Sequence, residues 1–263
     1  MRAFALLLAS SVSIVVQAAE AKPMRVASLN LCTDELLLAL ADDNQIASVT
    51  HLSKQASETP YWKKAQRYRT NDGSLLSVAT MKPDLVLTMG GGVRDRASIA
   101  GRLQIRILDL PYPQSLNDIE ASVAKVASAL GQHERGRQIV AQMRHLRRTA
   151  PARGVDTIWL GGGGRTVPAR GLAAEWMQLA GLRQRAFRGD RVSLEQLLVS
   201  PPRVLLRSDY REGEFSGEQR WMSHPLARRT RAGKTLATDG RRWTCMGPNL
   251  MPEILRLRRE LQR

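Results

Sequence analysis

Apolar and polar positions follow two alternating periods in the first 110 residues of the chain. Residues 24–31 alternate as in a β-strand, and the nearly continuous apolar run at 35–41 is typical of a buried helix. Thr33 and Asp34 precede that run and are the predicted helix N-caps. Further strands are predicted at 45–53, 85–89 and 105–110, with helices between them. This alternation predicts an α/β fold with a parallel or mostly parallel sheet and helices on both faces.

The pattern becomes purely helical at Ser115, a predicted N-cap, and continues at helical spacing to residue 150 with an interruption at Gly131. Strands and helices then alternate again. A helix–proline–strand unit occurs on each side of the helical stretch, at Pro83 and at Pro202. We therefore predict two similar Rossmann-like lobes, 22–114 and 151–263, joined by a long helix within 115–150. Ligands of such sheets bind beyond the carboxyl ends of the strands, which predicts a ligand cleft between the lobes.

The first 21 residues have the pattern of a signal peptide. Arg2 is followed by an apolar run from Ala3 to Val16, and small residues suited to signal peptidase stand at Ala18 and Ala21. The run is shorter than the ~20 residues that span a bilayer, and no cysteine follows it for lipid attachment. The sequence therefore predicts export, with 1–21 removed and no lipid anchor.

The net charge of the chain indicates which class of binding partner to expect. The chain has 40 Lys and Arg against 24 Asp and Glu, a net charge of +16 that removal of residues 1–21 leaves unchanged. Such a charge is common in nucleic-acid-binding proteins, but an exported protein meets little nucleic acid. Most of the arginines are scattered along predicted helices, as expected of a solvated surface. The charge therefore favours an anionic ligand or surface over nucleic acid.

Motifs for several enzyme chemistries are missing from the sequence. The run from Gly161 to Thr166 lacks the Gly-Lys-Ser/Thr ending of a phosphate-binding loop. There is no G-x-S-x-G motif, and the four histidines show no zinc-binding spacing. We expect no cofactor, no resident metal and no enzymatic activity. A secreted basic hydrolase, or a binding module for anionic envelope polymers, stays open as an alternative.

Several segments together resemble the periplasmic substrate-binding proteins of ABC importers for vitamin B12 and ferric siderophores. They are RVASLNLCTDELLLALA, IASVTHLS, LLSVATMKPDLVLTMGG, LAAEWMQLAGL and SLEQLLVSPPRVLL. The resemblance implies a monomeric periplasmic protein that captures a metal chelate or corrinoid (vitamin B12, a ferric siderophore or haem). It also implies delivery of this ligand to an ABC permease at the inner membrane.

The resemblance also implies site residues. The positions matched to ligand-facing loops are Asn30, Cys32, Thr33, His51, Gly91, Gly162, Arg165, Tyr210, Trp243 and Cys245. Glycines would let a flat ligand approach the backbone, Trp243 would offer an apolar face, and His51 and Arg165 would offer polar or positive groups. Glu175 matches a docking glutamate of the second lobe. The corresponding first-lobe glutamate is missing, and Asp72 is the nearest acid.

The chain has two cysteines, Cys32 and Cys245. Exported proteins with two cysteines usually oxidise them to one disulfide, and both cysteines map to the predicted cleft. A bond between them would join the two lobes. The alternatives are two free thiols, or a thiol that binds the metal centre of the ligand.

Overall fold

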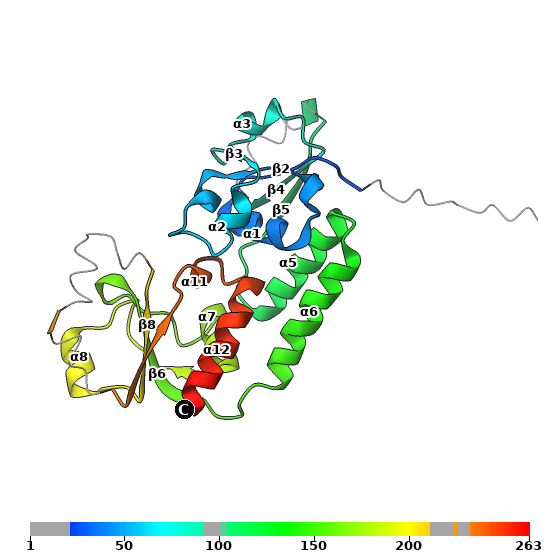
Figure 1. Ribbon diagram of the computed structural model, residues 1–263. Helices are drawn as coiled ribbons and strands as arrows, with labels where there is room; N and C mark the ends of the chain where they lie inside the picture. The colour runs from blue at the N-terminus through cyan, green and yellow to red at the C-terminus, as the bar shows by residue number, and fades with distance from the viewer. Residues whose placement is uncertain (1–21, 92–100, 103, 211–223, 226–231) are drawn as a thin grey trace, which may run out of the picture.

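Two parallel β-sheets form the two lobes of the computed structural model, which describes residues 22–91, 101–102, 104–210, 224–225 and 232–263 (Figure 1). The strands of the first sheet, in spatial order, are β3 (Arg69–Asn71), β2 (Ile46–Thr50), β1 (Val26–Ser28), β4 (Leu85–Met89) and β5 (Arg106–Leu110). All of its neighbouring pairs are parallel. The central strands β1 and β4 are fully buried, as expected of strands covered on both faces.

The helices of the first lobe are α1 (Leu31–Leu40), α2 (Trp62–Ala65) and α3 (Leu75–Ala79), with 3₁₀ turns η1 (Asp43–Gln45) and η2 (His51–Lys54). Helix α1 begins at Leu31, three to four residues earlier than the predicted N-caps imply. Its N-cap is Asn30, whose side-chain oxygen accepts a hydrogen bond from the backbone N–H of Cys32 at 2.9 Å. Thr33 and Asp34 lie inside the helix and are buried, so the predicted capping role was wrong.

The second sheet has the spatial order β7 (Leu182–Gln184), β6 (Val155–Leu160), β8 (Val204–Ser208) and β9 (Lys234–Thr238), again with parallel pairs only. Its helices are α7 (Leu172–Leu179), α8 (Leu194–Val199), α11 (Arg242–Cys245) and α12 (Met251–Gln262), with 3₁₀ turns η4 (Gly162–Gly164) and η5 (Pro248–Leu250). The predicted α/β fold with two similar lobes is confirmed, and the described strands are all parallel.

The connector consists of two helices, α5 (Leu116–Ala129) and α6 (His133–Arg148), which pack side by side (Figure 1). At its start α6 contacts the first lobe, where Arg135 pairs with Asp42 at 3.0 Å. At its end it contacts the second lobe, where Arg258 donates to the Leu146 carbonyl oxygen at 2.7 Å. Helix α6 is therefore the long helix that joins the lobes.

Two parts of the sequence prediction lie outside the described residues. They are the predicted signal peptide at 1–21 and most of the helix predicted before β5. In the part of the chain that is described, no helix is long and apolar enough to cross a membrane.

Candidate functional site

The strand order gives each lobe one switch point, and these two points define the candidate site. In the first sheet the chain changes direction of winding between β1 and β4, and in the second between β6 and β8. Ligands of open α/β sheets bind at such switch points, beyond the carboxyl ends of the strands. Asn30 and Gly91 follow β1 and β4, and Gly162 and Tyr210 follow β6 and β8. Residues from four separate parts of the sequence thus lie at the two switch points.

The two cysteines, one from each lobe, lie next to each other. Cys32 lies in the first turn of α1 and Cys245 at the end of α11. Their sulfur atoms are 2.10 Å apart and their Cα atoms 5.2 Å apart, which is within disulfide geometry. The structure thus places the two cysteines at the bonding distance that the disulfide prediction requires.

Glu35, one helical turn after Cys32, is a buried acid that bonds to residues of both lobes. The Glu35 side chain, 5% exposed, accepts hydrogen bonds from the Thr59 hydroxyl at 2.7 Å and from the Asn249 side-chain amide at 2.6 Å. Asn249 belongs to the second lobe. Burial raises the pKa of Glu35 to about 7, because desolvation disfavours the charged form more than the hydrogen bond from Thr59 favours it.

The neighbouring acid, Asp34, faces its own lobe. Its Oδ2 accepts hydrogen bonds from the Thr50 hydroxyl and the Ser53 hydroxyl, both at 2.5 Å. Burial raises the pKa of Asp34 to about 6 despite these bonds. The start of α1 therefore carries two adjacent buried carboxylates with raised pKa values, and that of Glu35 is raised further by the charge of Asp34.

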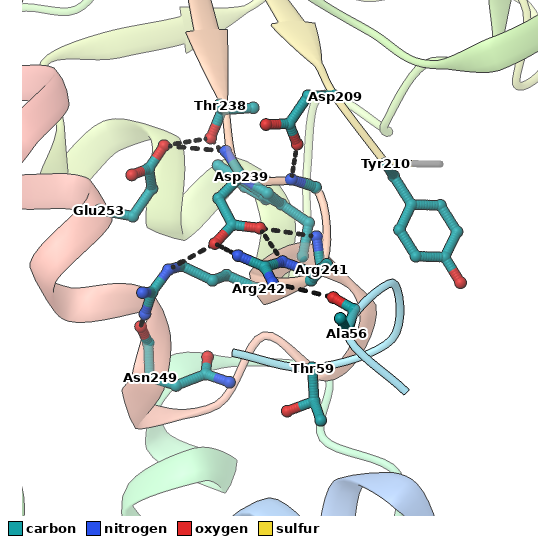
Figure 2. Close-up of polar contacts among 12 residues, drawn as sticks. Ala56, Thr59, Asp209, Tyr210, Thr238, Asp239, Arg241, Arg242, Asn249 and Glu253 are labelled. Carbon is teal, nitrogen blue, oxygen red and sulfur yellow. Dashed lines mark hydrogen bonds and ion pairs between the residues drawn. The ribbon is translucent and has the colours of Figure 1, made fainter. Parts of the chain in front are cut away.

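The second lobe supplies a cluster of charges at this contact (Figure 2). Asp239, directly after β9, pairs with Arg241 at 2.8 Å and with Arg242 at 3.1 Å. Burial works to raise the pKa of Asp239, but the hydrogen bond and charge of Arg241 outweigh it, so the pKa is lowered. Arg242 also donates to the backbone carbonyl of Asn249. This arrangement fixes the segment that carries Cys245 and Asn249.

Two further hydrogen bonds cross between the lobes. The Tyr210 hydroxyl donates to Glu58 at 2.9 Å. Arg241 donates to the backbone carbonyl of Ala56 at 2.9 Å (Figure 2). Glu58 and Ala56 both lie in the segment between η2 and α2 of the first lobe. Together with the Cys32 and Glu35 contacts, these bonds hold the described lobes in direct contact.

Three of the predicted ligand residues have structural roles in this arrangement. Thr33 is fully buried and bonds the Ser28 hydroxyl at 2.8 Å. Trp243 is 4% exposed, its ring lies beside that of Trp159, and its indole N–H donates to Thr238 at 2.8 Å. Asn30 caps α1. Trp243 was expected to offer a flat face to the ligand, but its ring is enclosed by the core of the second lobe.

Other predicted ligand residues lie nearer the surface. His51 and Arg165 are exposed, and Arg165 pairs with Asp190 at 3.5 Å. Gly91 and Gly162 are partly exposed. Gly91 has a φ of 80°, which favours glycine, and its backbone N–H donates to Asp109 at 3.2 Å.

The two predicted docking acids differ in accessibility. Glu175 is half-buried, and its carboxylate accepts a hydrogen bond from the backbone N–H of Leu116 at 2.7 Å, at the start of α5. Asp72 is exposed and accepts a hydrogen bond from the Ser74 backbone N–H at 2.8 Å. The hydrogen bonds from Ser74 lower the pKa of Asp72 to about 2. Asp72 is thus the more available of the two acids.

Sequence reasoning missed most residues of the contact between the lobes. Glu35 lies in an apolar run and Asn249 in a Gly-Pro turn, where a single sequence shows no reason to pair them. A signal did exist for Glu35, since acids within an otherwise apolar helix need a buried partner. Among the described residues, no group of three or more His, Cys, Asp or Glu side chains is placed to hold a metal ion.

Comparison with known proteins defines the class. Residues 26–153 match the family described as periplasmic binding protein. The match covers the first lobe and the connector, and it confirms the resemblance seen in the sequence. No curated protein matches the chain significantly.

Solved structures extend the likeness to both lobes. A periplasmic heme binding protein from Pseudomonas aeruginosa is 20% identical, with a TM-score of 0.66 over 90% of this chain and 91% of that one. The periplasmic vitamin B12 binding protein BtuF of Vibrio cholerae is 18% identical, with a TM-score of 0.64 over 91% and 97%. The siderophore binding protein BauB, bound to acinetobactin and ferric iron, is 14% identical, with a TM-score of 0.69 over 91% and 94%. At these identities the likeness shows the fold.

Proposed function

We propose that the protein captures a metal chelate or corrinoid between its lobes and delivers it to an ABC permease at the inner membrane. The candidate ligands are vitamin B12, a ferric siderophore and haem. The observation that supports the proposal most is the pair of parallel sheets, each with one switch point, in a chain whose residues 26–153 match the periplasmic binding protein family. Structural neighbours described as binding heme, a ferric siderophore and vitamin B12 support this range of ligands.

Ligand binding to the purified protein tests the proposal. Cyanocobalamin, haemin and a panel of ferric siderophores would be added separately, and unfolding followed by heat. A ligand present at 100 times its Kd should stabilise the protein by ~2.7 kcal/mol. Metal-free siderophores and iron-free protoporphyrin serve as controls for recognition of the metal complex. If none of the ligands shifts the transition, the proposed function is refuted.

The contribution of the predicted site is tested by substitution. Arg165→Ala and His51→Ala remove exposed side chains without disturbing the core, so the fold is retained. We expect each to weaken binding of the ligand found above. Arg153→Ala, at an exposed arginine outside the predicted site, is the matched control. Equal affinities in all three variants would show that the ligand binds elsewhere.

We propose that Asp72 and Glu175 contribute to docking on the permease. Asp72 is exposed and ionised at neutral pH, as a contact to a cationic partner requires. Asp72→Asn should reduce ligand uptake by cells and leave ligand affinity in solution unchanged. Glu175→Gln, which keeps an acceptor for the Leu116 N–H, tests the second acid in the same way. Normal uptake with both substitutions would refute this role.

We also propose that residues 1–21 are removed on export and that Cys32 and Cys245 are joined in the exported protein. The first point is supported by the composition of residues 1–21, and the second by the 2.10 Å separation of the sulfur atoms. The intact mass of protein from the periplasm tests both, after alkylation without reductant. A mass that includes residues 1–21 contradicts the first point, and two alkylated cysteines contradict the second.

A further inference from the structure

A cavity lies at the junction of the two lobes and the connector. Its volume is about 750 Å³, within the range of small-molecule sites. We call it the hinge groove. Its walls come from the first lobe at Pro60 and Tyr61, from α6, and from the η5–α12 segment of the second lobe. None of the residues predicted to bind the transported ligand lines it.

The floor of the hinge groove is apolar. It is formed by Leu146 of α6 and by Met251, Pro252 and Leu255 of α12, with Pro248 before them. Leu255 is 44% exposed, which is unusual for a leucine on a helix whose other leucine and isoleucine side chains pack into the core. This surface would gain free energy if a hydrocarbon group covered it.

The polar side chains of the hinge groove include several hydrogen-bond donors and one cation, Arg242. Arg242, His145, Gln142 and the Tyr61 hydroxyl line it. Burial raises the pKa of Tyr61 to about 12, so its hydroxyl keeps its proton at neutral pH. No Asp or Glu is among the residues that line the groove.

The nearest acids are already neutralised or enclosed. Asp239 pairs with Arg241 and Arg242. Glu35 is buried beneath Asn249, which lines the groove, and both oxygens of Glu35 accept hydrogen bonds. A negatively charged group entering the hinge groove would therefore meet positive charge and donors, with no exposed carboxylate to repel it.

We infer that the hinge groove is a binding site for an apolar monocarboxylate, with the hydrocarbon on the α12 leucine and methionine and the carboxylate near Arg242, His145 and Tyr61. Such a ligand uses both the positive charge and the apolar floor of the groove. A neutral apolar molecule would use only the floor, and a polar anion only the charge. The inference does not rest on the proposed transport function, because none of the predicted ligand residues lines the groove; Arg242 and Asn249 belong both to the groove and to the contact between the lobes.

Isothermal titration of the purified protein with decanoate tests the inference. Saturable binding is expected, with decan-1-ol and acetate each binding at least tenfold more weakly, because one lacks the charge and the other the hydrocarbon. Saturation with equal affinity for decanoate and decan-1-ol would overturn the assignment of a carboxylate site. Failure of decanoate to saturate would overturn the site itself.

Two substitutions on α6 locate the binding. Gln142→Trp fills the hinge groove, and Gln138→Trp, one helical turn earlier at an exposed glutamine outside it, is the matched control. Decanoate affinity should fall at least tenfold in the first and stay unchanged in the second. His145→Glu, also exposed, should weaken decanoate binding through charge repulsion without filling the space. Unchanged affinity in Gln142→Trp and His145→Glu would place decanoate elsewhere and refute the inference.

Discussion

The substitution Glu35→Gln is predicted to remove much of the pH dependence of stability. Glu35 is 5% exposed and bridges the lobes through Thr59 and Asn249. A glutamine at this position resembles the protonated acid. Its oxygen can accept the hydrogen bond from Asn249, and its amide can donate to the Thr59 hydroxyl. The variant should therefore keep the contact between the lobes without its charge.

The magnitude follows from the pKa of Glu35, which burial raises from 4.5 to about 7. An acid with a raised pKa in the folded state binds more protons when folded than when unfolded, so stability falls as pH rises between these two values. Their difference, at ~1.36 kcal/mol per pKa unit, gives a loss of about 3 kcal/mol between pH 4.5 and 7 and little further loss above 8. Asp34, whose pKa is raised from 3.8 to about 6, adds a loss of the same sign at lower pH.

Urea unfolding at several pH values between 5 and 8 measures this dependence, because urea adds no ionic strength. The wild-type free energy of unfolding should decrease across the range, and that of Glu35→Gln should decrease much less. Glu134→Gln is the matched control, since Glu134 is exposed on α6 and pairs with Arg137. If Glu35→Gln and the wild type lose the same stability from pH 5 to 8, Glu35 does not titrate as argued.

Three further predictions concern stability measured by urea unfolding at pH 7. Reduction of Cys32 and Cys245, 213 residues apart in sequence, should cost up to about 5 kcal/mol through loop-closure entropy, and unchanged stability under reductant would contradict a bond between them. Gly136→Ala should cost about 1–3 kcal/mol, because its new Cβ would lie 2.4 Å from the Ala127 Cβ; a stabilised variant would show that α5 and α6 separate freely. Glu175→Ala should cost about 1 kcal/mol by removing the acceptor for the first backbone N–H of α5, and the Gln variant should recover most of it.

Much of the fold could be predicted because it depends on local patterns. The buried strands β1, β4 and β8 are apolar runs next to turn residues, and each is followed or preceded by a helix with the expected period. The matching prolines Pro83 and Pro202 indicated two similar lobes, since both end a helix before a buried strand.

Two of the four edge strands of the described sheets, β3 and β7, could not be predicted from the same signals. β3 and β7 are three residues long, and β3 exposes Arg69 and Thr70. So short and polar a segment becomes a strand because its neighbour offers free backbone groups, which is a tertiary effect. The start of α1 was misplaced for a related reason. Asn30, Thr33 and Asp34 are all good N-caps, and only the direction of the chain leaving β1 selects Asn30.

In the candidate site, sequence patterns brought the two cysteines together and missed most of the contacts around them. Loops that follow buried strands could be placed at the interlobe site, and the two cysteines there lie at bonding distance. The hydrogen bonds between Tyr210 and Glu58 and between Glu35 and Asn249 could not be predicted. The two residues of each pair are more than 150 positions apart in sequence, and neither pair forms a recognisable motif. Trp243 shows the same limit, since a tryptophan beside a glycine-rich turn can face a ligand or its own core.

The kind of contact between the lobes determines how they can move. The three interlobe hydrogen bonds described here involve Glu35, Tyr210 and Arg241, and each contributes about 1 kcal/mol net. The free energy of ligand binding is large enough to break these hydrogen bonds, but it is too small to break a covalent bond between Cys32 and Cys245. Helix α6 is likewise attached to both lobes. If Cys32 and Cys245 are joined, the lobes can separate only by rotating about two fixed connections, the disulfide and α6. Reduction of the disulfide would leave α6 as the remaining connection of the two.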